Sequence, residues 1–128
     1  MGEATKSLRV LIVDDNEELR KMLGEVLERM GYGVESTDKA KEALSIVERG
    51  KADLMLLDLK MPGVGGFDLL KLVRRRHLPI PVIVVSAHIS QDVAKELAKV
   101  GIQGMIAKPF KRERMTEEID RVVQQYLT

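Results

Sequence analysis

Short apolar runs that alternate with longer segments of helical period are the feature of this sequence that most restricts its fold. Three of the five runs are almost continuously apolar, which is typical of parallel strands that helices cover on both faces. Parallel strands also need right-handed crossovers of helical length. The pattern therefore predicts an α/β fold built on a doubly wound parallel sheet. The expected strands lie near residues 8–13, 33–37, 53–57, 81–85 and 103–107.

The segments between the runs carry apolar residues at helical spacing. Residues 19–30 form a complete apolar stripe, with Asn16 as the expected N-cap and Gly31 at the expected end. The run at 33–37 alternates apolar and polar residues, so we expect it at an edge of the sheet. Further stripes predict four more helices, over residues 40–47, 67–73, 93–100 and 115–126.

The composition describes one globular domain. Hydrophobic residues make up 45% and charged residues 32% of 128 residues, which suits a chain with a real core. A net charge of +1 lacks the basic excess of nucleic-acid binding domains, and the absence of cysteine excludes disulfides and thiolate metal sites. No apolar stretch approaches the roughly 20 residues of a membrane span, and residues 1–7 do not resemble a signal peptide. We expect a cytoplasmic location without direct nucleic-acid or membrane contact.

Four of the apolar runs end on polar residues whose chemistry is complementary. The carboxyl ends of neighbouring parallel strands meet at one edge of a sheet, which is where open α/β sheets bind ligands. We therefore expect these polar side chains to lie close together. They are Asp14 and Asp15 after the first run, Asp58 after the third, Ser86 after the fourth and Lys108 after the fifth.

Three carboxylates at one edge need a cation. Two like charges about 4 Å apart repel by roughly 4 kcal/mol at an effective dielectric constant of 20. A hard divalent cation relieves this repulsion, and oxygen ligands without His or Cys favour Mg²⁺ over zinc. Asp58 is then placed as a nucleophile that takes a phosphoryl group as an aspartyl phosphate. Lys108 would supply positive charge to the phosphoryl oxygens, and the Ser86 hydroxyl would donate a hydrogen bond.

Each of these residues taken alone has a simpler explanation. An Asp after a strand is usually a turn or helix-capping residue, and the same holds for Ser86. Capping needs alone would rarely place all of them in this order, so the joint pattern favours a site.

Residues from about Leu8 to about Leu127 resemble the receiver domain of two-component response regulators, of the chemotaxis-regulator type. The most specific part is the Asp-Leu-Lys-Met-Pro-Gly-Val-Gly-Gly stretch at residues 58–66, where we expect Gly66 to supply backbone freedom before the third helix. The resemblance implies a flavodoxin-like (βα)5 sandwich with strand order 2-1-3-4-5. It also implies a receiver domain over residues 8–128, after a short extension over residues 1–7.

The resemblance also implies a role for each site residue. Asp58 would be the phosphoacceptor, and Mg²⁺ (or Mn²⁺) would be held directly by Asp15 and through water by Asp14. Ser86 would be the switch hydroxyl and Lys108 the phosphate-sensing lysine. The remaining assignments are the backbone carbonyl of Lys60 as a metal ligand and a cis peptide bond before Pro109.

One position departs from the family pattern. Three residues before the lysine, receivers usually place Tyr or Phe, whereas this chain has Met105. Methionine could fill the same space, but it lacks the two well-separated states of a ring, and core packing is its simpler role. Lys60 and His88 lie two residues after Asp58 and Ser86, and we hypothesise that they tune the lifetime of the aspartyl phosphate. Both could equally be solvated surface residues.

The resulting interpretation is a phosphoacceptor signalling switch and not a metabolic enzyme. A sensor histidine kinase or a phosphotransfer protein would be the donor. The fourth helix, fifth strand and fifth helix would then act on a downstream target, a linked output domain or a second copy as a phosphorylation-dependent homodimer. One alternative is an Mg²⁺-dependent phosphatase with an aspartyl-phosphate intermediate, as in haloacid-dehalogenase-like enzymes. In those the two acids lie two residues apart, whereas Asp14 and Asp15 are adjacent. A third interpretation is an interaction module that is not phosphorylated.

Overall fold

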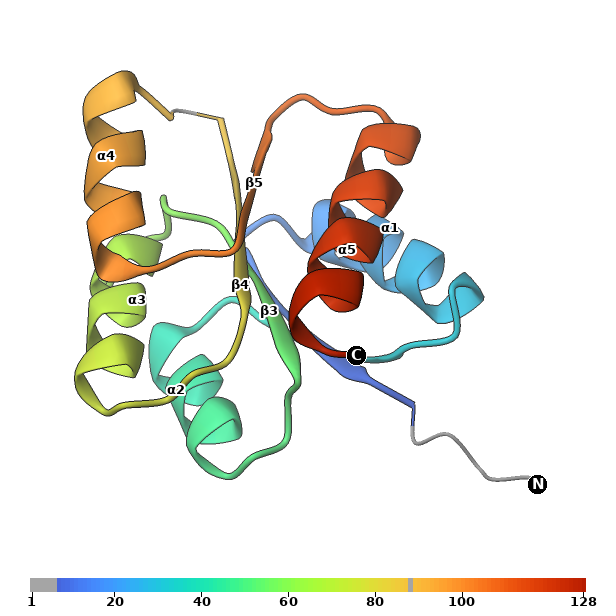
Figure 1. The fold of residues 1–128 in the computed structure, drawn as a ribbon, viewed down its shortest axis with the longest axis horizontal. Coiled ribbons are helices and arrows are strands. Elements are labelled where there is room, and N and C mark those ends of the chain that lie inside the picture. Colours follow the sequence, from blue (N-terminus) through green and yellow to red (C-terminus); the bar gives the residue numbers. More distant parts are fainter. Residues whose placement is uncertain (1–6, 88) are drawn as a thin grey trace.

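The chain folds into a five-stranded parallel sheet between two layers of helices (Figure 1). A computed structural model describes residues 7–87 and 89–128. The strand order β2-β1-β3-β4-β5 confirms the predicted doubly wound topology. In chain order the elements are β1 (Arg9–Val13), α1 (Glu17–Arg29), β2 (Gly33–Thr37), α2 (Ala40–Glu48), β3 (Leu54–Leu57), α3 (Gly66–Arg75), β4 (Val82–Ser86), α4 (Gln91–Val100), β5 (Gly104–Ala107) and α5 (Arg112–Tyr126).

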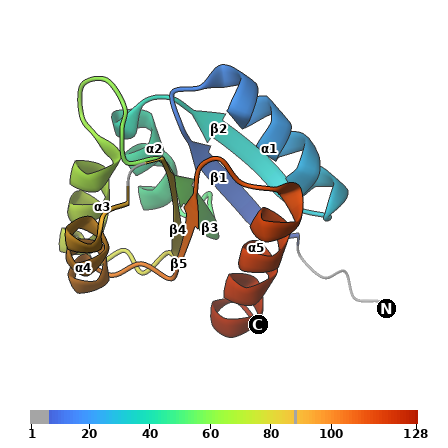
Figure 2. The same ribbon diagram turned by 90° about the horizontal axis from the view of Figure 1, so that it is seen from above.

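Each face of the sheet has its own hydrophobic core, because successive side chains of a strand point to opposite faces. One face packs against α2, α3 and α4, and the other packs against α1 and α5 (Figure 2). In β3, for example, Met55 and Leu57 point to the first core, whereas Leu54 and Leu56 point to the second. This burial on both faces explains why the central strands read as continuous apolar runs.

Helix ends follow the expected signals. The Asn16 side chain accepts a hydrogen bond from the Leu19 backbone N–H at 3.0 Å and caps α1. Gly31, with φ of 96°, lies just beyond the C-terminal end of this helix. Two expectations need correction: Ser86 is the last residue of β4 and does not follow it, and Tyr126 is 46% exposed because it lies at the end of α5, away from the core. No helix in the described part of the chain is both long and apolar enough to cross a bilayer.

The role expected for Gly66 is wrong. The glycines with positive φ in residues 7–87 and 89–128 are Gly31, Gly50, Gly63 and Gly101, so Gly66 needs no special backbone conformation. The constraint is steric instead. A Cβ atom at Gly66 would lie 1.9 Å from the backbone oxygen of Asp58. Glycine is therefore required because α3 begins directly against the end of β3.

This close approach predicts that Gly66→Ala is destabilising. The added methyl group would push α3 away from Asp58 and lower the unfolding free energy by about 3 kcal/mol, as in other overpacked sites. Gly24→Ala is the matched control, because its Cβ would lie at an ordinary 3.7 Å from Val34 and the change favours the α1 helix. Urea unfolding of both variants checks the prediction, and equal stability of the two would contradict it.

Candidate functional site

The site residues are placed by backbone hydrogen bonds that continue the sheet beyond the strands. The Asp14 N–H donates to the Thr37 carbonyl at 3.1 Å, and the Asp58 N–H donates to the Val13 carbonyl at 2.9 Å. At the other side of the sheet, the Lys108 N–H donates to the Ser86 carbonyl at 3.0 Å. The carboxyl edge is thus held in register up to the predicted site residues.

Three of the predicted acids form one cluster at this edge. Asp14, Asp15 and Asp58 each offer a carboxylate oxygen, and these oxygens all lie within 4.8 Å of one another. Asp14 and Asp58 are buried, whereas Asp15 is exposed. The Lys108 ammonium lies 2.8 Å from Asp14 Oδ2 and 3.7 Å from Asp58 Oδ2. One ammonium group therefore sits between two buried carboxylates.

Asp14 is the more firmly held of the two buried acids. Its Oδ1 accepts a hydrogen bond from the Asn16 N–H at 2.9 Å, while its Oδ2 accepts the bond from Lys108. The Arg20 guanidinium donates to the Asp14 backbone carbonyl at 2.7 Å. Both oxygens of this buried carboxylate are thereby satisfied, which is the condition for keeping a charge in the interior.

Asp58 is in a less favourable electrostatic environment. Burial raises its pKa above the ordinary value, and the neighbouring Asp14 charge raises it further. The Lys60 N–H, which donates to Asp58 Oδ1 at 3.3 Å, and the Lys108 ammonium act in the opposite direction. The charge on the Asp58 carboxylate is therefore only partly compensated by the surrounding protein.

This donor set fits a hard divalent cation. Its three carboxylates supply oxygen ligands, and its exposed member, Asp15, leaves an open side for water or phosphate oxygens. These are the properties of Mg²⁺ sites in proteins. Asp14, Asp15 and Asp58 are the side chains that could hold the ion.

The remaining predicted residues lie around this cluster. Ser86 is buried at the end of β4, and the Lys108–Pro109 peptide bond is cis. Met105 is half-buried on β5 and packs against the core that α2, α3 and α4 cover. The side chain of Lys60 is exposed. His88 and residues 1–6 of the predicted N-terminal extension lie outside the described residues.

From the sequence we did not identify two residues whose side chains hold the main chain in place, Arg20 at Asp14 and Glu118 at Met105. Arg20, on the first turn of α1, carried no recognisable signal. Glu118 did carry one, because it lies within the apolar stripe of α5, where Met115, Ile119 and Val122 are also buried. A charged residue in such a position needs partners, so the stripe itself could have indicated Glu118.

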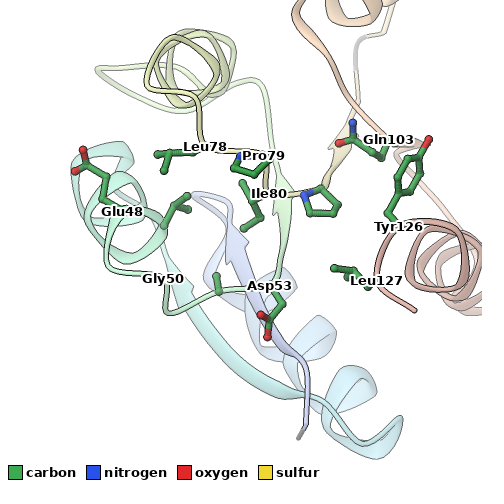
Figure 3. Close-up of a pocket in the computed structure, with 12 residues that line it drawn as sticks. Glu48, Gly50, Asp53, Leu78, Pro79, Ile80, Gln103, Tyr126 and Leu127 are labelled. Atoms are coloured by element: carbon green, nitrogen blue, oxygen red, sulfur yellow. The ribbon is translucent and has the colours of Figure 1, made fainter.

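A separate pocket lies at the opposite edge of the sheet, next to the amino ends of the strands. Figure 3 shows Leu78, Pro79, Ile80, Tyr126 and Leu127 among its lining residues. Its lining is mainly apolar, and it does not include any of the predicted site residues. Ligands of open α/β sheets bind at the carboxyl edge, so the acidic cluster remains the candidate site.

Comparisons with known proteins agree with this geometry. The family model of the response regulator receiver domain matches residues 10–120. The chain belongs to the response regulator receiver family. The receiver assignment and the flavodoxin-like sheet order expected from the sequence are both confirmed.

Relatives of this receiver domain match it over nearly its whole length. Chemotaxis protein CheY-3 of Vibrio cholerae is 32% identical over 124 residues, which cover 93% of this chain and 94% of that protein. Sporulation initiation phosphotransferase F of Bacillus subtilis is 35% identical, with 93% of each chain covered. The solved structure of the non-phosphorylated HemR receiver domain of Leptospira biflexa superposes with a TM-score of 0.87 at 30% identity, covering 95% of this chain and 97% of that chain.

The electrostatics of the site predict that Asp58→Asn stabilises the receiver domain in metal-free buffer. Because the pKa of Asp58 is raised in the fold, its ionised form costs stability at pH 7, and this cost disappears as the pH falls below the ordinary value of 3.8. Asparagine keeps the acceptor for Lys60 without the charge. We expect a gain on the order of 1 kcal/mol, since the Lys60 N–H and the Lys108 ammonium offset part of the cost of the charge.

Urea unfolding with a chelator, followed from pH 7 to pH 3.5, checks this prediction. The advantage of Asp58→Asn should shrink continuously toward the acidic end. Asp120→Asn, an exposed position on α5, is the control and should change little. A variant that is less stable than the wild type at pH 7 would show that Asp58 is not under electrostatic strain.

Proposed function

We propose that this receiver domain is a phosphoacceptor switch that takes a phosphoryl group on Asp58 from a histidine kinase or a phosphotransfer protein. The observation that supports it most is the combination of three carboxylates within 4.8 Å and an ammonium group 3.7 Å from Asp58. The three carboxylates would bind a cation, and the Lys108 ammonium would bind an anion. The name of one relative, sporulation initiation phosphotransferase F, is in keeping with phosphoryl chemistry.

In the proposed reaction a carboxylate oxygen of Asp58 attacks the phosphorus atom of the donor. A new P–O bond forms while the P–N bond to the donor imidazole breaks, and the imidazole leaves with the electron pair and takes up a proton. Lys108 is close enough to both carboxylates to follow the negative charge from Asp14 toward the phosphoryl oxygens. The Ser86 hydroxyl is proposed to donate a further hydrogen bond to the same oxygens.

The cation of the proposed site is Mg²⁺, with Mn²⁺ as a substitute. Asp14, Asp15 and Asp58 would hold it, together with the backbone carbonyl of Lys60 that the family resemblance implies. When bound, the ion offsets the charge of the carboxylates and of the transferring phosphoryl group.

The phosphoryl donor would dock beside the site. A groove of about 470 Å³ is lined by Leu19 and Met22 of α1 and by Lys108, Pro109 and Phe110 after β5. It includes Lys108, whose ammonium lies 3.7 Å from Asp58 Oδ2, so a partner seated here would lie next to the site. Its apolar floor suits a helix of a histidine kinase or a phosphotransfer protein.

The output surface would be formed by α4, β5 and α5. Phosphorylation adds about −1.5 to −2 charges and would draw Ser86 and Lys108 toward Asp58. A second groove along this surface is lined by Ile89, Met105, Phe110 and Arg114, among others. A downstream target, a linked output domain or a second copy would bind there, with a coupling of about 1–3 kcal/mol to the phosphoryl site.

The phosphoacceptor assignment predicts a covalent adduct. Acetyl phosphate with Mg²⁺ should add one phosphoryl mass to the wild type, measured by intact-mass spectrometry, because a small phosphoryl donor needs no docking surface. The adduct should be absent from Asp58→Asn and should disappear when EDTA removes the metal.

Two controls give this experiment its force. Asp120→Asn removes an exposed carboxylate and should be phosphorylated like the wild type. Inorganic phosphate release is followed in parallel, so that rapid turnover is not mistaken for lack of reaction. If neither an adduct nor phosphate release is observed, while Mg²⁺ binding is shown separately, the result contradicts the proposed function and favours an interaction module.

The sequence positions of Lys60 and His88, two residues after Asp58 and Ser86, predict an effect on the lifetime of the aspartyl phosphate. Lys60 is adjacent to the acceptor oxygen through its backbone, so its side chain can restrict the approach of water. We expect Lys60→Ala and His88→Ala to change the first-order decay of the purified phosphoprotein by roughly threefold or more, which is at least about 0.6 kcal/mol in the barrier. Lys41→Ala, exposed on α2, is the control. Unchanged decay in both variants would make these two residues ordinary surface positions.

A further inference from the structure

Three side chains of α5 cover the outer edge of β5, the last strand of the sheet. The Met105 N–H donates to Glu118 Oε2 at 3.0 Å, and the Met105 carbonyl accepts a hydrogen bond from Arg114 at 3.0 Å. One turn further along α5, Arg121 donates a hydrogen bond at 2.8 Å to the carbonyl of Gln103, the residue just before β5. We call Arg114, Glu118 and Arg121 the β5 clamp. Main-chain groups that would face outward from the edge are thereby bonded to one helix.

The clamp is held together by its own charges. Glu118 accepts hydrogen bonds from Arg114 at 3.3 Å and from Arg121 at 3.0 and 3.1 Å. Its side chain is only 10% exposed, whereas those of the two arginines are about half exposed. The Arg121 bond, and after it the Met105 N–H, lower the pKa of Glu118 despite its burial. The carboxylate therefore stays charged and remains an acceptor for the Met105 N–H at neutral pH.

The strand is built to receive this carboxylate. A Cβ atom at Gly104 would lie 2.8 Å from Glu118 Oε2 and 3.1 Å from Val122. Glycine at this position is what lets Glu118 reach the main chain of β5. The contact thus depends on a glycine in the strand, a carboxylate in the apolar stripe of α5 and two arginines on neighbouring turns.

The clamp bears directly on Met105. In this position a flexible methionine side chain cannot carry a directional displacement as a rigid ring would. Its main chain, by contrast, is fixed to α5 through both its N–H and its carbonyl. Lys108, three residues further along the chain, contacts the two buried carboxylates of the site. One short strand therefore connects the phosphoryl-sensing lysine with the residues that α5 holds.

We propose that Glu118 is a positioning residue that makes the main chain of Met105 and helix α5 move together, so that phosphorylation of Asp58 is passed to α5 through the backbone of β5. This inference rests on the proposed function, because it needs a phosphoryl group to displace Lys108. It assigns to main-chain hydrogen bonds the coupling that an aromatic side chain would otherwise provide.

Amide NMR of the whole domain tests the clamp in two stages. In the unphosphorylated protein, Glu118→Ala should speed hydrogen exchange of the Met105 amide by roughly tenfold or more, since the amide loses a charged acceptor. Glu117→Ala, the exposed neighbour on α5, should leave this rate unchanged. Equal Met105 exchange in all three proteins would overturn the inference before any phosphorylation is attempted.

The second stage uses acetyl phosphate and Mg²⁺, with intact mass as the measure of phosphorylation. Glu118→Ala should be phosphorylated like the wild type but should lose more than about half of the α5 chemical-shift changes. Glu118→Gln keeps the volume and an acceptor oxygen, so it should recover part of the α5 response. This variant also tests the clamp if the alanine variant fails to fold.

The outcomes separate the two proposals. A wild type that never gains the phosphoryl mass or releases phosphate overturns the proposed function, whereas the exchange result for Met105 stands by itself. A phosphorylated Glu118→Ala with full α5 shift changes overturns the inference and leaves the proposed function intact. A phosphorylated wild type whose α5 amides do not shift overturns it equally.

Discussion

The repulsion among the carboxylates of Asp14, Asp15 and Asp58 is the constraint on which the rest of the structure depends. Among the described residues, the Lys108 ammonium pairs with two of these three charges, so the cluster keeps an excess of negative charge. A divalent cation equals this excess in magnitude and is opposite to it in sign. When a phosphoryl group then adds about two more negative charges, the same cation and the same lysine are the groups that can respond. The charge imbalance would thus account for both parts of the proposed function, the binding of a metal ion and the response to phosphorylation.

The sheet is what holds these repelling groups together. The central strands are buried on both faces, and their ladder hydrogen bonds extend to Asp14 and Asp58 themselves. Gly66 adds to this arrangement, because its missing side chain lets α3 start against the backbone of Asp58. The apolar core therefore supplies the stability, and the carboxyl edge carries the charge repulsion among the three carboxylates.

The sequence predicted the features that depend on local pattern. It did not predict features that are determined by contacts between residues far apart in the sequence. Apolar runs and helical stripes are local, so they indicated the strands, the helices and the edge position of β2 correctly. The strand ends indicated that Asp14, Asp58 and Lys108 lie close together. They did not indicate that Asp14 makes the shorter contact with Lys108, because these two residues are 94 positions apart in the sequence. Gly66 was misjudged for the same reason, since its constraint is the backbone of Asp58 and not its own dihedral angles. Tyr126 had the helical spacing of a core residue, yet α5 ends beyond the core.

If Glu118 couples β5 to α5 as proposed, this receiver can depart from the family pattern at one side chain and still transmit its signal. β5 is short and pairs with β4 along one side, so much of its hold on the rest of the molecule must come from elsewhere. The Glu118 carboxylate and its two arginines supply that hold from α5. The contacts that stabilise β5 are also the contacts through which a displacement of β5 would be transmitted to α5. A substitution of Met105 that leaves its main chain in place would then affect packing more than signalling, whereas the loss of Glu118 would affect both.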